Sequence, residues 1–202
     1  KIRDHYTGVD LDHFQPADKA AAKAALGLSG PVILSVGALI ERKGQDILIR
    51  ALSQMPDARL ILAGHGPDMR AFKALAASLG VDNRVGFLGP VPHDNLPGIF
   101  NAADVIALPS MSEGLANVWV ESLACGTPIA ITDVGGAREV LDTAIAGRIA
   151  ERTPAAFAEA ITDVLAHPSD PHDVRASAMR FTWGANGDAL LAHLSAIAGK
   201  SG

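Results

Sequence analysis

Two glutamates, Glu113 and Glu121, have seven residues between them, and the segment also carries Gly114 and Asn117. A carboxylate can accept two hydrogen bonds from a vicinal diol, such as the 2′- and 3′-hydroxyls of a ribose. We predict that Asn117 is the N-cap of a helix, which puts Glu121 in the first turns of that helix. The backbone amides near Gly114 are open to a diphosphate, because glycine lets a ligand approach the backbone closely.

The two carboxylates suit different parts of such a ligand. Glu121 lies within the predicted helix and suits the ribose. Glu113 precedes the helix, and a carboxylate beside a phosphate is repelled, so we assign it to the hydroxyl groups of a sugar ring. Each glutamate alone also has a structural interpretation, since an acid in the first turn of a helix stabilises the helix dipole.

A second candidate anion site follows the apolar run at residues 32–36. Gly37 permits close approach of a ligand to the backbone. Lys43 lies just before a predicted helix start, where free amides and the helix dipole already favour anions. A phosphate there meets amides and an ammonium together, although a solvated Lys-Gly turn is the simpler interpretation of this segment by itself.

His65 stands between Gly64 and Gly66 after the next apolar run, and Pro67 opens the helix that follows. This arrangement again favours an anion near a helix terminus, and His65 either lines the cleft or caps the turn. It is not a dinucleotide-binding fingerprint, because G-x-G-x-x-G needs a third glycine where Met69 stands. No segment reads G-x-x-x-x-G-K-[ST], which excludes a P-loop.

Six short apolar runs must position these loops, at residues 32–36, 58–63, 84–88, 104–108, 128–132 and 146–150. Each run is nearly unbroken, which is typical of strands that are buried on both faces. Helical patterns separate the runs, at residues 45–55, 67–79, 96–103, 117–124 and 154–166. The alternation predicts an α/β fold, a Rossmann-like doubly wound parallel sheet with helices on both faces. Ligands of such sheets bind outside the carboxyl ends of the strands.

The composition limits the kinds of partner. The 202 residues suit one large domain or two small ones, and a content of 49% hydrophobic and 19% charged residues, with a formal net charge of −5, is enough for a substantial core. The chain has no basic stripe, so we expect no nucleic-acid partner. Cys125 is the only cysteine, which excludes a disulfide framework, and its apolar context predicts a buried thiol. No apolar run reaches the roughly 18 residues of a membrane helix.

The two ends of the chain lie outside the predicted sheet. Residues 17–26 predict an Ala-rich helix ahead of the first strand. Residues 171–198 predict two helices, separated near Trp183, which either pack on the sheet domain or reach toward a missing partner domain. The chain begins with Lys1 and opens with no signal peptide, so we expect it to be a piece of a longer protein.

Several loops, taken together, carry a family resemblance. The segments are residues 8–14, 36–44, 64–67, 87–91, 112–114 with Glu121, 124–128 and 135–139. In order and spacing they resemble the C-terminal domain of GT-B-fold glycosyltransferases, specifically the retaining group called glycosyltransferase family four. The resemblance runs from about Thr7 to the final helix after Trp183, which predicts that residues 1–202 form one nucleotide-sugar-binding domain.

The resemblance implies a role for each candidate residue. Glu121 is similar to the family's ribose-binding glutamate, and Glu113 is similar to the glutamate that faces the donor sugar, so Glu113 is the expected catalytic residue. Lys43 matches the lysine that contacts the donor diphosphate. The backbone at Val91 matches the position that reads the nucleobase edge. The other residues that we expect to contact the donor are Gly37, Arg42, His65, Gly114, Leu115 and Ala116.

The resemblance also implies an activity. A sugar passes from a nucleoside diphosphate sugar, of the UDP or GDP type, to an unknown glycan, lipid or small-molecule acceptor, with retention of anomeric configuration. No cofactor is implied, and no metal is bound to the protein by a DxD motif. The acceptor site belongs to an N-terminal domain that this chain lacks, so the chain alone is expected to be inactive. We expect a cytoplasmic location, with peripheral membrane association open only for the full-length protein.

Two positions depart from the family pattern. The family often has Arg directly after the glycine of the first strand, as a second diphosphate contact, and this chain has Ala38 there. Arg42 lies close by in sequence and is the candidate substitute. Thr7 stands where Asn is usual, before Gly8. The phosphate side of the site is therefore where this chain differs most from the family.

Other functions stay open on the same architecture. A nucleotide-sugar epimerase or a phosphorylase uses other loop residues, and a product assay with a labelled donor separates either from a transferase. A catalytically inactive nucleotide-binding module is the second alternative, given Ala38, and turnover by the protein with its N-terminal half restored decides it. A dehydrogenase is disfavoured by the missing glycine fingerprint, and absence of NAD(H) binding would close that question.

Overall fold

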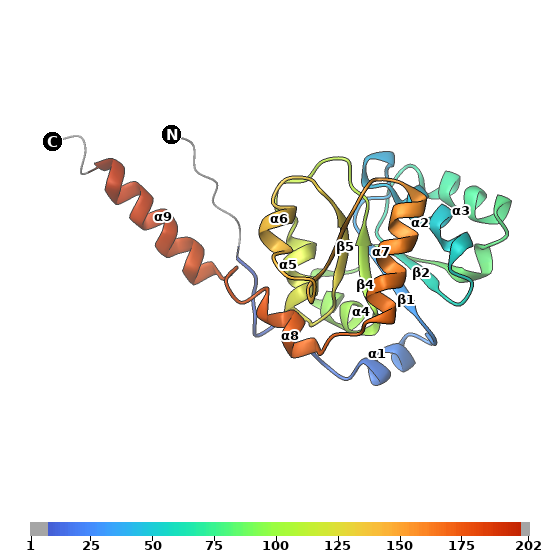
Figure 1. Ribbon diagram of the computed structural model, residues 1–202, viewed down its shortest axis with the longest axis horizontal. Helices are drawn as coiled ribbons and strands as arrows, with labels where there is room; N and C mark the ends of the chain where they lie inside the picture. The colour runs from blue at the N-terminus through green and yellow to red at the C-terminus, as the bar shows by residue number, and fades with distance from the viewer. Residues whose placement is uncertain (1–7, 199–202) are drawn as a thin grey trace.

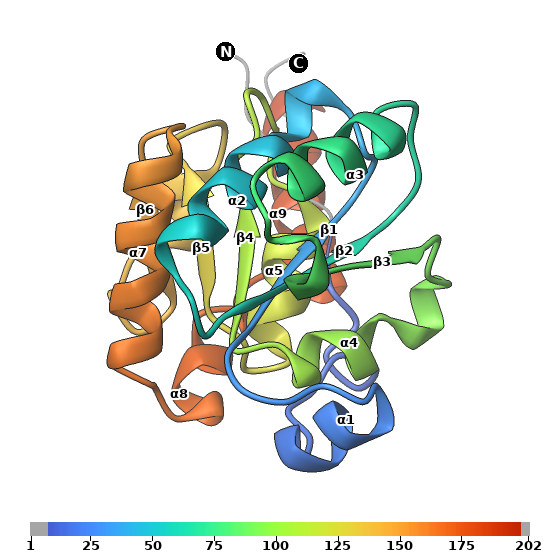
Figure 2. The same cartoon turned by 90° about the vertical axis from the view of Figure 1, so that its right-hand side faces the viewer.

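The structure is a computed structural model that describes residues 8–198, so Lys1 and Thr7 lie outside the described residues. Six strands form its central sheet: β1 (Val32–Val36), β2 (Arg59–Ala63), β3 (Val85–Gly89), β4 (Val105–Leu108), β5 (Ile129–Thr132) and β6 (Gly147–Ala150). Their order is β3-β2-β1-β4-β5-β6, and all five neighbouring pairs are parallel. Figure 2 shows this order, with β6 at the left and β3 at the right.

The six predicted strands lie within one residue of the observed ones at each end, and the Rossmann-like doubly wound sheet is confirmed. One part of the expectation is wrong, because the two edge strands are not buried on both faces: the two middle residues of β6 are half-buried, and β3 is more exposed still. Its residues are half-buried and Leu88 is exposed. Their position explains this exposure, because each of these strands ends the sheet and has a neighbouring strand on one side only.

Helices of both types connect the strands. The α-helices are α1 (Lys19–Ala25), α2 (Gln45–Ala51), α3 (Met69–Ser78), α4 (Leu96–Ala102), α5 (Asn117–Ala124), α6 (Ala137–Val140), α7 (Pro154–Ala166), α8 (Pro171–Ala176) and α9 (Trp183–Ala198). The short 3₁₀ helices are η1 (Glu41–Lys43), η2 (Leu52–Gln54), η3 (Asp82–Arg84) and η4 (His93–Asn95). The sequence patterns did not predict α6, because four residues are too few to show a helical period.

The sheet separates two hydrophobic cores, because successive strand residues point to opposite faces. On β1, Val32 and Leu34 belong to one core and Ile33 belongs to the other. Helices α2, α3 and α7 cover the core of Ile33, and α4, α5, α6 and α8 cover the core of Leu34. Figure 1 shows α2, α3 and α7 on one side of the sheet and α5 and α6 on the other.

Helix α5 follows β4 and begins one residue earlier than the predicted N-cap implies. Ala116 is its N-cap, and no side-chain hydrogen bond caps this end, so the prediction of Asn117 as the N-cap is wrong. Asn117 is instead the first helical residue. Trp119 is fully buried and fixes the helix against the core. The N-terminus of α5 therefore keeps its backbone amides uncapped by a side chain at the edge of the sheet where β4 ends.

The terminal helices behave differently from one another. Helix α1 packs against α4, and α8 packs against α5. Helix α9 has no buried residue, and Figure 1 shows it extending away from the sheet. Trp183, Leu191 and Leu194 on α9 are each more than half exposed, at 59%, 65% and 55%. Within residues 8–198, no helix is both long enough and apolar enough to cross a membrane.

Cys125 at the C-terminus of α5 provides a test of this packing. The residue is 2% exposed, and burial raises the pKa of its thiol to about 12. Because the thiolate is the reactive form, we predict that the folded chain reacts with an aromatic disulfide reagent at pH 8 far more slowly than the urea-unfolded chain. Absorbance of the released thiolate measures both rates. Equal rates would contradict the packing of α5.

Candidate functional site

The site lies at the point in the sheet where the strand order reverses, between β1 and β4. β1 and β4 are neighbours, but the chain leaves β1 toward β2 and leaves β4 toward β5. The loops that follow them diverge, and we call the region between these loops, at the carboxyl ends of β1 and β4, the crevice, because sheets of this kind bind ligands there. Lys43 follows β1 and Glu113 follows β4, and Lys43 Nζ lies 2.5 Å from Glu113 Oε1. The structure thus brings together two predicted site residues that are 70 positions apart.

This ion pair is shielded from solvent. The side chains of Lys43 and Glu113 are 19% and 12% exposed. Exposed ion pairs contribute about 0–1 kcal/mol to stability, whereas removing one partner of a buried pair costs about 3–5 kcal/mol. The pair lies between these limits. Each side chain therefore needs a partner of opposite charge. For Lys43 this is Glu113 or an anionic ligand group, and for Glu113 it is Lys43 or a ligand group that donates hydrogen bonds.

Backbone contacts reinforce the link between the two loops. Arg42 donates from Nη1 to the carbonyl of Ser112 at 2.9 Å, and the Met111 amide donates to the Arg42 carbonyl at 2.8 Å. Arg42, the predicted substitute for the family's second diphosphate contact, therefore lies at the crevice with one donor already used. Ala38 is exposed at the same edge.

The loop after β2 packs on the loop after β1. The Leu39 amide donates to the His65 carbonyl at 3.0 Å, and the Glu41 amide donates to Asp68 Oδ2 at 2.7 Å. A Cβ added at Gly64 would lie 1.9 Å from the Gly37 carbonyl oxygen. Gly64 thus serves contact between the loops, and His65 is exposed beside the crevice.

Two predicted glycines have a different environment. A Cβ added at Gly37 would have Lys43 Cε at 4.0 Å as its nearest neighbour, and one added at Gly114 would meet nothing within 4 Å. Both positions face open space next to the ion pair. They leave room for a ligand against the backbone, in contrast to the closely packed Gly64.

The loop after β5 supports the segment around Gly114. The Gly136 amide donates to the Gly114 carbonyl at 2.9 Å. Leu115 packs within 3.2 Å of the Cβ position of Gly136, and both Leu115 and Ala116 are half-buried at the start of α5. The backbone that leads from Glu113 into α5 is therefore fixed from behind.

Glu121 lies on α5 at the other end of the site. It is 6% exposed, and its Oε1 lies 2.9 Å from His93 Nε2. His93 begins η4, two residues after Val91, which is half-buried against the core. The structure therefore joins Glu121 to the loop of Val91 through His93. The sequence patterns did not single out His93, because a histidine in a polar loop carries no signal of a distant carboxylate.

Two further residues that the sequence patterns missed hold the loops in place. Gln45 is fully buried and donates from Nε2 to the Ala38 carbonyl at 2.9 Å. Arg152 follows β6 and donates to the Pro109 carbonyl at 2.9 Å and to the Glu41 carbonyl at 2.8 Å. Their partners are distant in sequence or are backbone atoms, so no local motif marks either residue.

His93 belongs to a group of three potential metal ligands. His13, His93 and Asp94 have ligand atoms that all lie within 4.8 Å of one another. Their side chains come from the loop after Val9 and from η4. No part of this group is near the Lys43–Glu113 pair in sequence, and His93 joins it to the site through Glu121.

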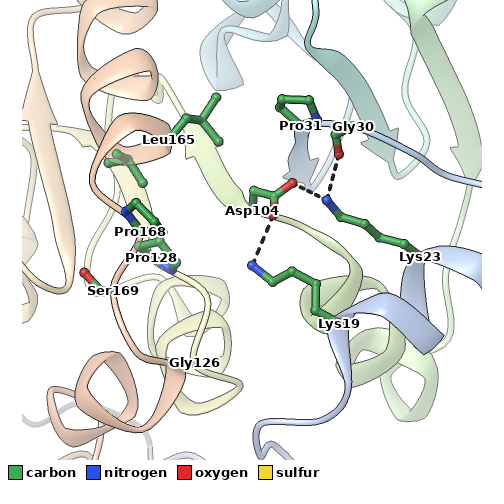
Figure 3. Close-up of a pocket in the computed structure, with 11 residues that line it drawn as sticks. Lys19, Lys23, Gly30, Pro31, Asp104, Gly126, Pro128, Leu165, Pro168 and Ser169 are labelled. Atoms are coloured by element: carbon green, nitrogen blue, oxygen red, sulfur yellow. Dashed lines mark hydrogen bonds and ion pairs between the residues drawn. The ribbon is translucent and has the colours of Figure 1, made fainter.

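A separate cavity of about 390 Å³ lies at the amino ends of the strands, near Pro31 and Pro128. Figure 3 shows Lys19 and Lys23 reaching Asp104 there, at 3.2 and 2.5 Å. Asp104 Oδ2 also accepts the Val32 amide, at 2.8 Å. These contacts fasten α1 below the sheet, at the edge opposite to the predicted site.

Comparison with known proteins identifies the family. The sequence profile of the family described as glycosyl transferases group 1 matches residues 17–181. The chain belongs to this family. The resemblance inferred from the loop segments is therefore confirmed.

Similar proteins are about twice as long as this chain. The D-inositol 3-phosphate glycosyltransferase of Mycolicibacterium vanbaalenii is 37% identical over 209 residues, which cover 93% of this chain and 46% of that protein. The enzyme of the same description from Mycobacterium leprae is 37% identical over 207 residues, which cover 95% and 48%. The chain thus spans about half the length of the curated relatives it matches.

Solved structures share the fold. The crystal structure of Anabaena HepE in complex with UDP and glucose has a TM-score of 0.85 at 26% identity, covering 95% of this chain and 56% of that one. Sucrose-phosphate synthase from Thermosynechococcus elongatus has a TM-score of 0.81 at 29% identity, covering 99% and 53%. The C-terminal domain of LpcC from Francisella tularensis, at 20% identity, has a TM-score of 0.70 and is covered to 96%. This chain therefore has the fold of one GT-B domain.

The two kinds of glycine give a testable contrast. We predict that Gly64→Ala lowers the free energy of unfolding by about 2–4 kcal/mol, because its Cβ would collide with the Gly37 carbonyl at a positive φ of 148°. Gly114→Ala has open space and should change it by less than about 1 kcal/mol. Urea denaturation followed by circular dichroism measures both. A Gly64→Ala variant as stable as the unchanged chain would contradict the close packing of these loops.

Proposed function

We propose that the crevice at the carboxyl ends of β1 and β4 binds a nucleoside diphosphate sugar, and that this chain is the donor-binding half of a retaining glycosyltransferase. The observation that carries the proposal is the Lys43–Glu113 pair across the crevice, with Glu121 on the helix that follows. A cation for phosphate and two carboxylates for hydroxyl groups match the chemistry of such a donor.

In this proposal the diphosphate binds next to Lys43. The ammonium, the open backbone at Gly37 and Gly114, and the uncapped N-terminus of α5 all favour an anion. An incoming diphosphate competes with Glu113 for Lys43. The exchange releases the Glu113 carboxylate, which the diphosphate repels and the sugar hydroxyls attract. Ligand binding thus converts a resting ion pair into two separate contacts.

In this proposal the ribose binds to the carboxylate of Glu121. His93 contacts only one of the two carboxylate oxygens in the structure. A carboxylate has about four acceptor sites, so the second oxygen can receive a ribose diol while His93 keeps its contact. The nucleobase then extends toward the backbone at Val91, which lies two residues before His93. His65 and Arg42 border the crevice from the β1 and β2 side and extend the polar surface that faces the donor.

In this proposal Glu113 faces the donor sugar and the bond that breaks. As the bond to the diphosphate breaks, the sugar becomes oxocarbenium-like, and Lys43 with the amides near Gly114 stabilises the departing nucleoside diphosphate. Retention of configuration is part of the proposal. HepE, which shares the fold at 26% identity, was solved with UDP and with UDP-glucose, and this supports a donor of the UDP type, with GDP as the alternative. The reaction as proposed uses no cofactor and no protein-bound metal.

The acceptor site is proposed to lie in an N-terminal domain, because the chain spans about half of its relatives. The exposed apolar side chains of α9, led by Trp183 and Leu191, suit packing against that domain. Glycan, lipid and small-molecule acceptors all fit this arrangement. A cytoplasmic location, and peripheral membrane association of the full-length protein, are part of the same proposal.

A nucleotide-binding module without activity is the second candidate function, favoured by one observation. Ala38 provides no cation, and Arg42 has a donor engaged by Ser112, so Lys43 carries most of the positive charge at the crevice. Turnover of labelled donor by the protein with its N-terminal half restored distinguishes the two candidates. Product formation supports the transferase, and tight nucleotide binding without turnover supports the module.

Glu121 gives the first test of the proposed donor. We predict that Glu121→Ala weakens UDP binding by about 10- to 100-fold, since hydrogen bonds to a charged acceptor contribute about 1.5–3 kcal/mol. Isothermal titration calorimetry measures the affinity, and GDP is titrated in parallel. Glu159→Ala, which removes an exposed carboxylate from α7, is the matched control. Unchanged affinity in Glu121→Ala would remove this residue from the ribose role.

Lys43 gives the second test. We predict that Lys43→Ala weakens UDP binding by about 10- to 100-fold and uridine binding by less than about threefold, because only UDP carries the diphosphate. Lys73→Ala, which removes an exposed ammonium from α3, is the control for net charge. Equal losses for UDP and uridine would argue against a phosphate contact.

A double variant separates two causes of that loss. Lys43→Ala also leaves Glu113 without its cation, and the unpaired carboxylate repels phosphate. Lys43→Ala combined with Glu113→Gln removes this repulsion. UDP affinity should stay low in the double variant if Lys43 contacts the diphosphate, and full recovery would assign the loss to Glu113 instead.

A further inference from the structure

A corner that contains two histidines adjoins the carboxylate of Glu121. His13 lies in the loop between Val9 and α1, and His93 and Asp94 lie in η4. One ligand atom from each of these three side chains lies within 4.8 Å of the others. The two imidazole rings are stacked, with centroids 6.2 Å apart and planes inclined by 25°. Two segments that are 80 residues apart thus place nitrogen and oxygen ligands together.

His13 has a buried nitrogen that lacks a protein partner. Its Nε2 atom is inaccessible to solvent and makes no hydrogen bond in the described residues. Burying an unpaired polar atom costs about 1–3 kcal/mol. Either tautomer leaves this atom unsatisfied, because it needs a donor in one case and an acceptor in the other. A metal ion would satisfy a neutral imidazole nitrogen at this position.

His93 is held as metal-binding histidines are held. Its Nε2 lies 2.9 Å from Glu121 Oε1, and Glu121 is 6% exposed. When one ring nitrogen donates to a carboxylate, the other nitrogen is left with its lone pair and a fixed direction. Glu121 therefore orients His93 and leaves Nδ1 as the nitrogen that can bind a metal.

The loop that carries His13 is rigid before any ligand arrives. Asp10 Oδ1 accepts the amides of Asp12 and His13, at 3.0 and 3.1 Å. Arg175 donates to the carbonyls of Leu11 and Phe14, at 2.7 and 2.5 Å. The Phe14 ring, which is 1% exposed, contacts both histidine rings edge-on, with centroids 4.8 Å from His13 and 5.2 Å from His93.

We propose that His13, His93 and Asp94 bind a divalent transition-metal ion of the Zn²⁺ type, with Glu121 as the outer partner of His93. Two imidazoles and one carboxylate suit Zn²⁺ and its borderline neighbours, whereas Mg²⁺ and Ca²⁺ prefer oxygen ligands throughout. Three protein ligands leave a fourth tetrahedral position for water or a ligand. The ion takes no part in the transfer chemistry proposed for Lys43 and Glu113.

The proposed metal site and the proposed donor site share Glu121, but separate experiments test them. Metal binding is measured without any nucleotide, so its outcome does not depend on the ribose role of Glu121. UDP binding is measured in a chelating buffer, so its outcome does not depend on the metal. A result against one proposal leaves the other standing.

The experiment is calorimetric titration of the chain, free of any affinity tag, with ZnCl₂, together with absorption spectra of the Co²⁺-loaded chain. We expect one high-affinity site per chain and the visible bands of tetrahedral Co²⁺. His93→Asn and Asp94→Asn, which alter exposed side chains, should each weaken Zn²⁺ binding at least about 10-fold, and Glu121→Gln by a similar factor through His93. His172→Ala, an exposed histidine on α8 outside the group, should leave the affinity unchanged.

The decisive comparison is between His93→Asn and His172→Ala. The absence of a stoichiometric Zn²⁺ site, or equal affinities in these two variants, overturns the proposal. His13→Asn is the third ligand variant, and its thermal melt is recorded because the ring packs on Phe14. If that variant does not fold, the exposed His93 and Asp94 variants alone decide the outcome.

Discussion

The Lys43–Glu113 ion pair is the contact on which the arrangement of this site depends. The strand order sends the chain in opposite directions from β1 and β4, and the pair spans the crevice that this divergence opens. Arg42 and Met111 add contacts beside it, and these contacts link the two loops to each other. A diphosphate can replace Glu113 at Lys43 without a large rearrangement, because the ammonium is already held at the crevice.

Close packing between glycine-containing loops holds the Lys43 and Glu113 segments in position. Gly64 meets Gly37 so closely that a Cβ has no room, and Gly135 meets Gly114 in the same manner, with a Cβ position 2.1 Å from its carbonyl oxygen. Side chains from outside the motifs complete the support: Arg152 holds the backbone after both β1 and β4. Rigid loops of this kind favour ligand binding because little conformational entropy is lost on association. The open positions at Gly37 and Gly114 are then the places where a ligand can approach.

The sequence predicts the fold well because buried parallel strands are read directly from short apolar runs, as β1 illustrates, whose bounds match the predicted ones at both ends. It also predicts that Lys43 and Glu113 share one edge, since both follow strands of the same sheet. The errors have local causes: β3 lies at the edge, and Asn117 falls one residue inside α5. His93 and Gln45 escape prediction for another reason. Each acts through a contact that only the tertiary fold creates, so no spacing or residue type announces it.

The crystal structure of the chain with bound UDP tests the central claim most directly, because it locates every contact in one measurement. We predict that the ribose hydroxyls lie within hydrogen-bond distance of Glu121, that the diphosphate contacts Lys43, and that Glu113 has separated from Lys43. The nucleobase should lie against the backbone at Val91. UDP bound elsewhere, or bound with the Lys43–Glu113 pair intact and the ribose away from Glu121, would contradict the proposed donor site.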